Sequence, residues 1–393
     1  MSEWKEILLP EITTKIGDGL HGTPVYDNNG DYYFINGNNL VNGKIIIKED
    51  TKRLSESEFQ KHAKPLNERT LLLGINGTIG NVAYYKNEKC MLGKSACYIN
   101  LNSDVDARFV YYTFLGRDFQ NYIEGIATGT TIPNVPLKGI REFSFKIPPL
   151  SEQRAISSIL SSLDDKIDLL HRQNATLEKM AETLFRQWFV EEAKADWEEV
   201  SLYDAIELVG GGTPKTSEPE YWDGNFNWLS GGDIAGNHKN FVISSEKAIS
   251  ELGLRNSSAK LLPKFSTVIS ARGTVGKYCL LSKPMTFSQS NYGILPKYKD
   301  CFFFTYLLVA HSVDELLSAA YGSVFDTITT NTFKGLTVSL PEINQIFLFE
   351  DTVKPYFLKI LANQTQIRTL TALRDTLLPK LMSAEVRVSL EQD

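Results

Sequence analysis

The sequence has few of the side chains that link small proteins covalently or through metals. Its 393 residues include five histidines and four cysteines, and no Cys-x-x-Cys pair occurs. A disulfide framework or a zinc ribbon needs paired cysteines, so we expect neither. Unpaired cysteines are typical of a reducing compartment, so we expect a cytoplasmic protein. The four cysteines are Cys90, Cys97, Cys279 and Cys301.

Long hydrophobic runs are also missing. No stretch of 18 consecutive apolar residues occurs, so we expect no membrane-spanning helix and no membrane partner. The polar, acidic start Met1–Glu6 predicts no signal peptide. With 42% hydrophobic and 22% charged residues, the chain has the composition of a globular protein with a sizeable core. Its length predicts two to three domains.

Basic residues do not outnumber acidic residues, with 41 Lys and Arg against 47 Asp and Glu. The formal net charge is -6, and none of the segments 1–150, 151–195, 196–340 and 341–393 is net positive. Composition alone therefore does not indicate a nucleic-acid partner. It excludes a protein that is basic over its whole surface, but it leaves a local basic face open.

The most informative feature is an internal duplication. Six short strings return in the same order, at offsets between 190 and 196 residues. This period is far longer than that of a solenoid repeat, so we interpret it as two collinear halves. The strings that return begin at Trp4, Gly22, Gly77, Lys138, Pro149 and Glu182, and their copies begin at Trp197, Gly212, Gly273, Lys334, Pro341 and Asp375.

Each half begins with about 145 residues that predict a mixed α/β domain. Runs of β-branched and aromatic residues between glycines and asparagines predict short strands, as in Asp31–Ile35, Lys44–Ile47 and Leu261–Ser270. Apolar residues at helical spacing predict one helix in each domain, Arg108–Ile123 and Phe302–Leu317. The expected fold class is therefore α+β, with two mixed domains.

Each half ends in a long helix. In the first, seam positions four and three residues apart predict a coiled coil over 152–190, about 58 Å long. Asn174 lies in this seam and either fixes the register of a helix pair or faces solvent. We expect Trp188 to lie in a core. The seam consists of Ile156, Leu160, Leu163, Ile167, Leu170, Asn174, Leu177, Ala181, Leu184 and Trp188.

The second long helix has a less regular pattern. Pro355 predicts a break or kink near residue 354, because proline cannot donate the helical hydrogen bond. Two similar long helices in one chain can pair, and we expect an antiparallel pair. The positions that keep the four-and-three spacing are Val353, Phe357, Ile360, Gln364 and Ile367, and those that fit a 3.6-residue period better are Leu370, Leu373, Leu377 and Leu381.

The sequence contains no complete catalytic motif. The GxGxxG string at 17–22 is followed by Thr23-Pro24 rather than by a helix pattern, so it does not predict a dinucleotide site. Gly93-Lys94-Ser95 lacks the first glycine of a P-loop, and no HExxH string exists. The Asn/Asp-Pro-Pro-aromatic tetrapeptide of adenine methyltransferases is missing as well. We therefore expect a non-catalytic protein without a metal.

One string at the end of the first domain resembles a known family. Lys146–Gln153 reads KIPPLSEQ and runs into the long helix, where Leu163–Ile167 reads LDDKI. With the Ala127–Thr131 turn and Arg272–Gly276, this closely resembles the specificity subunit of type I restriction-modification enzymes. The second boundary, Leu340–Gln345, departs from the pattern, because it has one proline and no Glu-Gln pair.

The resemblance implies the following organisation, with an internal pseudo-twofold axis. Residues 1–147 and 194–341 are target recognition domains, and each reads half of a bipartite double-stranded DNA sequence. Residues 148–193 and 342–393 are the long helices, which pack antiparallel, fix the gap and dock two modification subunits. Those methyltransferase subunits carry S-adenosylmethionine, so this chain binds no cofactor, and restriction (motor-nuclease) subunits join for cleavage. The helix positions expected to space or dock are Ile156, Leu160, Leu163, Ile167, Leu170, Asn174, Leu177, Leu184, Ile360, Ile367 and Leu377.

The DNA-contacting residues are expected in polar, glycine-containing loops, because Arg, Lys, Asn, Gln, Ser and Thr read base edges. Lys94 and Arg272 are the strongest candidates, since a charged group in such a loop needs a partner or solvent. The alternative is that these strings are only turn chemistry. The candidates are Thr23, Asn38, Asn39, Lys94, Ser95, Thr128, Thr130 and Thr131 in the first domain, and Thr213, Lys215, Arg272, Gln289, Ser290, Asn291 and Ser323 in the second.

Two other interpretations stay open at this point. A structural adaptor, with two β-rich modules on a coiled coil, would explain the acidic composition without DNA. A specificity chain with a fused methyltransferase would be an enzyme, although the missing tetrapeptide argues against it.

Overall fold

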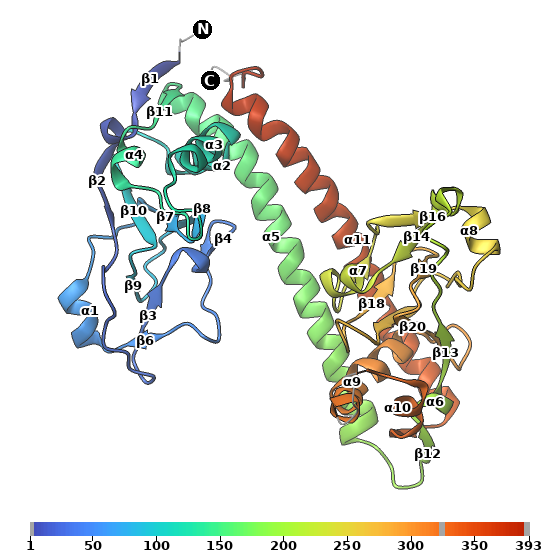
Figure 1. Cartoon of the computed structure of the whole chain (residues 1–393). Coiled ribbons are helices and arrows are strands. Elements are labelled where there is room, and N and C mark those ends of the chain that lie inside the picture. Colours follow the sequence, from blue (N-terminus) through green and yellow to red (C-terminus); the bar gives the residue numbers. More distant parts are fainter. Residues whose placement is uncertain (1–3, 322–326, 389–393) are drawn as a thin grey trace, which may run out of the picture. The chain divides into compact units, whose positions relative to one another are not determined.

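The chain is organised in two units, which a computed structural model describes over residues 4–321 and 327–388. Unit 1 comprises residues 1–166 and 370–393, and unit 2 comprises residues 167–369. Each unit holds a mixed α/β domain and part of each of two long helices (Figure 1). The two units are described separately below.

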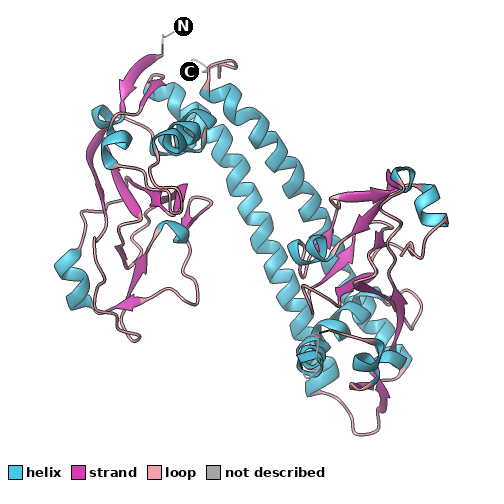
Figure 2. Ribbon diagram, viewed as in Figure 1, coloured by secondary structure: helices cyan, strands magenta, loops and turns pink. Residues whose placement is uncertain are grey.

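The domain of unit 1 is made of short strands and short helices (Figure 2). The strands are β1 (Lys5–Leu8), β2 (Thr13–Asp18), β3 (Tyr32–Ile35), β4 (Leu40–Val41), β5 (Lys44–Ile45), β6 (Arg53–Leu54), β7 (Thr70–Asn76), β8 (Thr78–Tyr84), β9 (Cys90–Leu92), β10 (Ala96–Leu101) and β11 (Ser144–Ile147). The helices are η1 (Leu9–Ile12), η2 (Gly37–Asn39), α1 (Glu56–His62), α2 (Ala107–Leu115), α3 (Arg117–Ile126) and α4 (Leu137–Arg141).

An antiparallel sheet of order β2-β10-β7-β8 is buried on both faces. Side chains alternate along a strand, so the neighbours on β7 enter different cores. Leu71 and Leu73 pack with Phe109 and other residues of α2 and α3. Leu72 faces the other way and packs with Ile35 of the smaller sheet β6-β3-β9. The remaining pairs are β1-β11 and β4-β5.

The domain of unit 2 has a similar composition of elements. Its strands are β12 (Glu198–Ser201), β13 (Ile206–Gly210), β14 (Trp222–Leu229), β15 (Phe241–Val242), β16 (Lys247–Ile249), β17 (Thr267–Ser270), β18 (Tyr278–Leu281), β19 (Thr286–Phe287), β20 (Asn291–Pro296) and β21 (Thr337–Leu340). Its helices are α6 (Leu202–Ala205), η4 (Pro219–Tyr221), α7 (Gly231–Gly236), α8 (Glu251–Arg255), α9 (Phe302–Tyr321) and α10 (Thr330–Lys334).

The sheets of unit 2 repeat the plan of unit 1. A five-stranded sheet of order β13-β20-β17-β18-β15 has two buried faces, and β16-β14-β19 forms the smaller sheet. On β17, Ile269 enters the core that α9 covers, while its neighbour Val268 packs with Leu229 and Phe287 of the smaller sheet. The pair β12-β21 corresponds to β1-β11. The two domains therefore share one architecture, in agreement with the duplication in the sequence.

Helix α9 is strongly apolar. Its segment Phe302–Ala320, with a mean hydropathy of 1.2, is long and apolar enough to cross a membrane by these two criteria alone. Half of that segment is buried inside the protein, and its side chains belong to the core of unit 2. Its apolar character is therefore explained by packing. The buried members include Phe303, Phe304, Leu307, Leu308, Val309, Leu316 and Ala320.

The two long helices, α5 (Leu150–Arg186) and α11 (Ile343–Met382), pass through both units. In unit 2 they run antiparallel, because Asn174 contacts Asn363 and the ring of Phe185 lies 5.8 Å from that of Phe349. In unit 1, Asp164 contacts Arg374, 2.9 Å away. The expected pairing of the long helices is confirmed in each unit. A π-helical turn, η3 (Gln187–Glu191), continues α5.

The seam of α5 is buried to different degrees. Ile156, Leu160, Leu170, Asn174 and Ala181 are buried on α5, and Val353, Phe357, Ile360 and Leu381 are buried on α11, where Leu373 is exposed. The remaining seam positions are half-buried, which fits a helix pair that shares its faces with a domain in each unit rather than an isolated coiled coil. These half-buried positions include Leu163, Ile167, Leu177, Leu184, Trp188, Ile367 and Leu377.

Three expectations about elements were wrong. The helix predicted at 108–123 is two helices, α2 and α3, because Gly116 is extended and its N–H donates to the carbonyls of Tyr112 and Thr113. A break or kink was predicted near residue 354, and no break interrupts α11. Pro355 lies on the exposed face, where water can satisfy the freed carbonyl, while Val353 and Phe357 anchor the helix in the core. The strand predicted at 261–270 is only β17.

Candidate nucleic-acid interface

Four loops of unit 1 meet beside the ends of β7 and β10. We call residues 36–39, 74–80, 93–95 and 128–135 loop cluster 1. Backbone hydrogen bonds join them: the N–H of Ile75 donates to the carbonyl of Ser95 (2.9 Å), and the N–H of Val135 donates to the carbonyl of Ile75 (2.8 Å). The N–H of Gly37 donates to Oγ of Ser95 at 3.0 Å. Segments far apart in the sequence thus form one contiguous surface.

Unit 2 contains the corresponding loops. We call residues 230–233, 270–276, 288–291 and 327–329 loop cluster 2. The N–H of Ala271 donates to the carbonyl of Ser290 (3.0 Å), and the N–H of Ile328 donates to the carbonyl of Ala271 (3.1 Å). These two bonds are the counterparts of those made by Ile75 and Val135. The duplication has therefore preserved a framework of loops as well as a core.

Glycines make the central turn of each cluster possible. Gly77 and Gly80 in cluster 1, and Gly273 and Gly276 in cluster 2, have φ between +72° and +84°. A side chain is disfavoured there on backbone grounds. At Gly80 a Cβ atom would also meet Oε1 of Gln120 at 2.2 Å. The glycines of the Gly-Thr strings are therefore required by the conformation of these turns. Other residues of the same turns can still contact DNA.

Four of the predicted contact residues use their side chains inside the protein. The hydroxyl of Thr128 donates to the carbonyl of Asn134 at 3.1 Å. Asn39 accepts from the N–H of Asn36 (3.0 Å) and donates to the carbonyl of Ile46 (3.0 Å). The Ser95 hydroxyl donates to Oδ1 of Asn36 (2.8 Å). Asn291 is 1% exposed and donates to Oγ of Ser288 at 2.7 Å. These side chains hold the loops in shape.

Other predicted contact residues present their side chains to solvent. In cluster 1, Asn38 and Lys94 are exposed beside Thr130 and Thr131 of the 128–135 loop. Thr23 is exposed three residues after Leu20, which bridges to Gly93.

In unit 2, Arg272 and Gln289 are exposed in cluster 2, and Ser290 is half-buried. Thr213 is half-buried and Lys215 exposed, just after Gly212, whose N–H donates to the carbonyl of Phe287. Ser323 lies outside the described residues.

The two clusters carry their cations at different positions. Arg272 of cluster 2 corresponds to Asn76 of cluster 1, and Lys94 of cluster 1 corresponds to Gln289 of cluster 2. The same framework thus presents different donors in the two units. Thr78 and Ile132 are also exposed in cluster 1, but they were not among the predicted DNA-contacting residues. An isoleucine before a proline gives no signal of exposure in the sequence.

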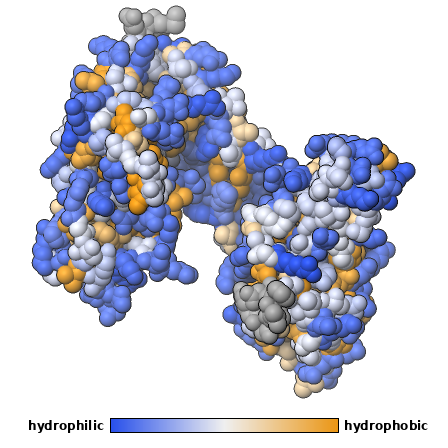
Figure 3. Space-filling view, viewed as in Figure 1, coloured by the Kyte–Doolittle hydropathy of each residue, from blue (hydrophilic) through white to orange (hydrophobic). Residues whose placement is uncertain are grey.

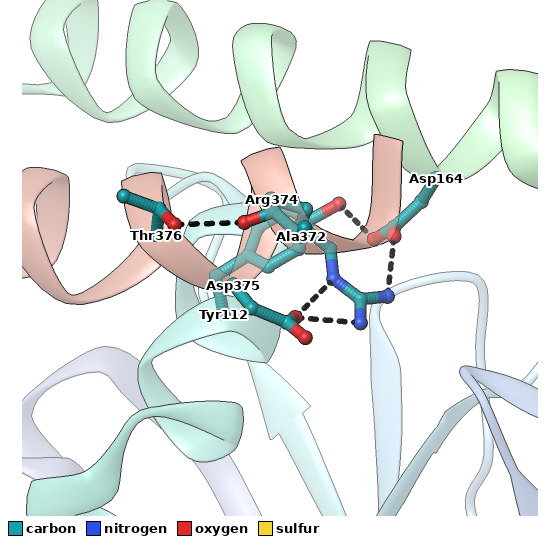
Figure 4. Close-up of polar contacts among 6 residues, drawn as sticks. All are labelled: Tyr112, Asp164, Ala372, Arg374, Asp375 and Thr376. Carbon is teal, nitrogen blue, oxygen red and sulfur yellow. Dashed lines mark hydrogen bonds and ion pairs between the residues drawn. The ribbon is translucent and has the colours of Figure 1, made fainter. Parts of the chain in front are cut away.

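A polar junction ties the domain of unit 1 to both long helices (Figure 4). Oδ2 of Asp164 on α5 accepts from the hydroxyl of Tyr112 on α2 at 2.7 Å. Oδ1 of Asp164 accepts from Nη1 of Arg374 on α11 at 2.9 Å. Arg374 also contacts Asp375. Burial and the bond to Asp164 raise the pKa of Tyr112, so its hydroxyl stays a donor.

A different junction ties the domain of unit 2 to α11. The carboxylate of Glu350 accepts from the N–H groups of Phe303 (3.0 Å) and Phe304 (2.8 Å) at the start of α9. These N–H groups have no partner within the helix, so Glu350 caps it. Burial raises the pKa of Glu350 to about 7. Between the helices, the amide of Asn363 donates to Oδ1 of Asn174 at 2.8 Å.

Possible metal ligands do not cluster in the part of the chain that the structure describes. Within it, no group of three or more histidine, cysteine, aspartate or glutamate side chains could hold a metal ion. All four cysteines are buried, and burial raises the pKa of the Cys90 and Cys301 thiols to about 12. On the face seen in Figure 3, small hydrophobic groups are scattered over a mostly hydrophilic surface.

Known proteins resemble this chain over nearly its whole length. It is 25% identical over 384 residues to the type I restriction enzyme MjaIX specificity subunit of Methanocaldococcus jannaschii, covering 91% of this chain and 88% of the relative. It is 24% identical over 473 residues to the HindI specificity subunit of Haemophilus influenzae, covering 98% and 100%.

A solved structure shares the fold. The type I restriction-modification S subunit from M. genitalium matches with a TM-score of 0.66 at 18% identity, over 97% of this chain and 96% of that one. The family model for the type I restriction modification DNA specificity domain matches twice, at residues 1–179 and 194–372. The chain therefore belongs to the type I restriction-modification DNA specificity family, as a duplicated specificity subunit.

Proposed function

We propose that the two domains read the two halves of a bipartite double-stranded DNA site. As a specificity subunit, the chain is a non-catalytic part of a restriction-modification complex. In this proposal residues 1–147 and 194–341 are the target recognition domains. Residues 148–193 and 342–393 are the helices that fix the gap between the half-sites. The contacts with bases and phosphates come from the exposed residues of the two loop clusters.

The partners follow from the same proposal. DNA and the other subunits of the complex are implied by family membership. We infer that two modification subunits dock on the helices and bring S-adenosylmethionine, so that this chain binds no cofactor itself. Restriction subunits join for cleavage, and the complex works in the cytoplasm. The acidic composition of the chain is tolerable if the modification subunits share the phosphate contacts, which dominate affinity.

The observation that carries the proposal is that the two loop clusters share the same backbone hydrogen bonds but expose different hydrogen-bond donors. The bonds of Ile75 and Val135 in unit 1 recur at Ala271 and Ile328 in unit 2. The exposed cations differ, with Lys94 in one cluster and Arg272 in the other. Two similar readers with different base-contacting side chains suit two different half-sites. This pattern, with family membership, favours the DNA reader over the adaptor interpretation.

A domain exchange tests the proposal. Residues 1–147 are replaced by the corresponding domain of a relative, and the chain is assembled with its modification subunits. Methylome sequencing should show one half-site changed and the other unchanged. The reciprocal exchange of residues 194–341 should change only the other half. The chain alone with S-adenosylmethionine should methylate nothing. A change of both half-sites in either chimera would contradict the assignment of one domain to one half-site.

A further inference from the structure

The 128–135 loop of unit 1 presents an isoleucine to solvent among polar side chains. Ile132 is 60% exposed, and Thr128, Thr130 and Thr131 beside it are exposed too. A single exposed apolar residue is ordinary on a protein surface. This one differs because it belongs to loop cluster 1, the surface proposed above to read DNA, and because the backbone that carries it is held firmly.

Hydrogen bonds fix both ends of the segment that carries Ile132. Thr128 and Asn134 exchange two backbone bonds of 2.8 Å each, which close the loop. The N–H of Gly77 donates to the carbonyl of Pro133 at 2.9 Å. The side-chain amide of Asn76 donates to Oδ1 of Asn134 at 3.1 Å. The loop is thus attached to the central turn of the cluster, and little conformational entropy remains to be lost on binding.

The backbone conformation also leaves little freedom at the tip. Gly129 has φ +91°, and a Cβ atom there would lie 2.5 Å from the carbonyl oxygen of Ile132. Pro133 restricts the residue before it to extended conformations. The Ile132 side chain is therefore displayed in a narrow range of positions.

DNA offers one apolar group to such a side chain. In the major groove the C5-methyl of thymine is the apolar feature among donors and acceptors. The major groove is wide enough for a two-stranded ribbon, whereas the minor groove is about half as wide. The hydroxyls of Thr130 and Thr131, which precede Ile132, can meet base edges or phosphates at the same time.

We propose that Ile132 is a specificity-determining residue that contacts the C5-methyl group of a thymine in the half-site read by the first domain. This inference rests on the proposed DNA-reading function. The repeat supports it: the offset that relates Val135 to Ile328 aligns Ile132 with Phe325, so both halves have an apolar residue at this position. Phe325 lies outside the described residues.

The test removes the methyl group from the DNA and the side chain from the protein. The complex assembled with modification subunits is titrated with duplexes that carry the methylome-defined site. Each thymine, on both strands, is replaced in turn by deoxyuridine, which lacks only the methyl group. For the wild type, one position in one half-site should weaken Kd about fourfold, the value of one buried methyl group. In Ile132→Ala the cognate Kd should weaken about tenfold, and that same position should no longer respond.

Graded and matched variants complete the design. Ile132→Val should weaken binding by a few-fold, less than alanine does. Leu8→Ala removes another exposed apolar side chain of unit 1, on a strand that pairs with β11, and should leave Kd and the deoxyuridine response unchanged. Unaltered Kd in Ile132→Ala, no coupled position, or a half-site without any T·A pair would overturn the inference. Failure of the proposed function would look different, since the wild-type complex would then show no bipartite methylation.

Discussion

At the scale of residues, the loops divide into side chains that support and side chains that are displayed. Asn39, Ser95 and Asn291 have partners within their own domain. An asparagine or serine with an internal partner would have to break that bond before it could read a base. Lys94 and Arg272 are exposed in the same loops. The discriminating residues are therefore expected among the displayed set.

The first prediction concerns Arg272→Ala and Lys94→Ala. If the side chain contacts a base, specific binding should lose about 1–3 kcal/mol at one half-site only. If it contacts a phosphate, binding should weaken for all sequences, and the slope of log K against log salt should fall by about 1. Titrations of the assembled complex at several salt concentrations separate these cases.

Lys283→Ala serves as the control for the first prediction, because Lys283 is exposed in unit 2 outside loop cluster 2. If Arg272→Ala or Lys94→Ala binds DNA with the affinity and salt slope of the wild type, the substituted residue does not belong to the interface.

At the scale of elements, the domains are attached to the long helices by different chemistry. In unit 1 the junction joins the buried Tyr112 to Asp164 and Arg374, whose side chains are partly exposed. In unit 2 it is the buried carboxylate of Glu350, which caps α9. A buried carboxylate is costly when it is ionised, even when N–H groups donate to it. The second attachment should therefore depend on pH.

The second prediction follows from the sign of this effect. Burial raises the folded-state pKa of Glu350 to about 7, above that of an unfolded glutamate. The folded state thus binds the proton more tightly, and its stabilising contribution is present at low pH. It is lost as the pH rises toward 7. From pH 5 to pH 8 the wild type should lose about 1–3 kcal/mol relative to Glu350→Gln, measured by denaturant unfolding.

Two further variants define what Glu350 contributes. Glu350→Ala leaves the N–H groups of Phe303 and Phe304 without their acceptor and should destabilise unit 2 by about 1–3 kcal/mol. Hydrogen exchange in the first turn of α9 should locate the loss. Glu342→Gln neutralises an exposed carboxylate just before α11 and should leave the pH profile unchanged. If the free energy of unfolding of the wild type depends on pH as little as that of Glu350→Gln does, folding does not raise the pKa of Glu350.

At the scale of the whole molecule, both long helices pass from one unit to the other. The units meet on α5 between Lys166 and Ile167, and on α11 between Thr369 and Leu370. Each unit keeps its own helix–helix contacts, such as Asp164–Arg374 in unit 1 and Asn174–Asn363 in unit 2. An insertion at these two points therefore disturbs neither set of contacts.

The third prediction uses these points. Four residues inserted after Lys166, with four inserted after Thr369, add about 6 Å of rise to each helix. Because B-DNA advances about 3.4 Å per base pair, the unread gap should lengthen by one to two base pairs while both half-sites stay the same. Methylome sequencing of the assembled variant gives the gap directly.

An insertion in α5 alone is the control for the third prediction, because it puts the helix pair out of register and should cost stability. An active double insertion with the original gap would mean that the helices dock partners without measuring DNA.

Much of this architecture could be predicted from the sequence. The duplication, the two α/β domains and the paired long helices rest on patterns that recur along the chain and need no knowledge of distant contacts. The heptad seam, the glycine turns and the KIPPLSEQ string are patterns of this kind. The fold class, the family and the non-catalytic role could therefore be predicted without the structure.

Which side chains within these patterns are exposed, and which are held by partners elsewhere in the chain, depends on the folded structure. Asn38 and Asn39 are neighbours of the same type, yet Asn38 is exposed and Asn39 bonds to Ile46. Pro355 stays within α11 because the core holds Val353 and Phe357 on either side of it. Asn174 is buried because Asn363, 189 residues later, supplies its hydrogen bond. The fate of a polar or helix-breaking residue depends on partners that the fold brings from far along the chain, and local sequence carries no record of them.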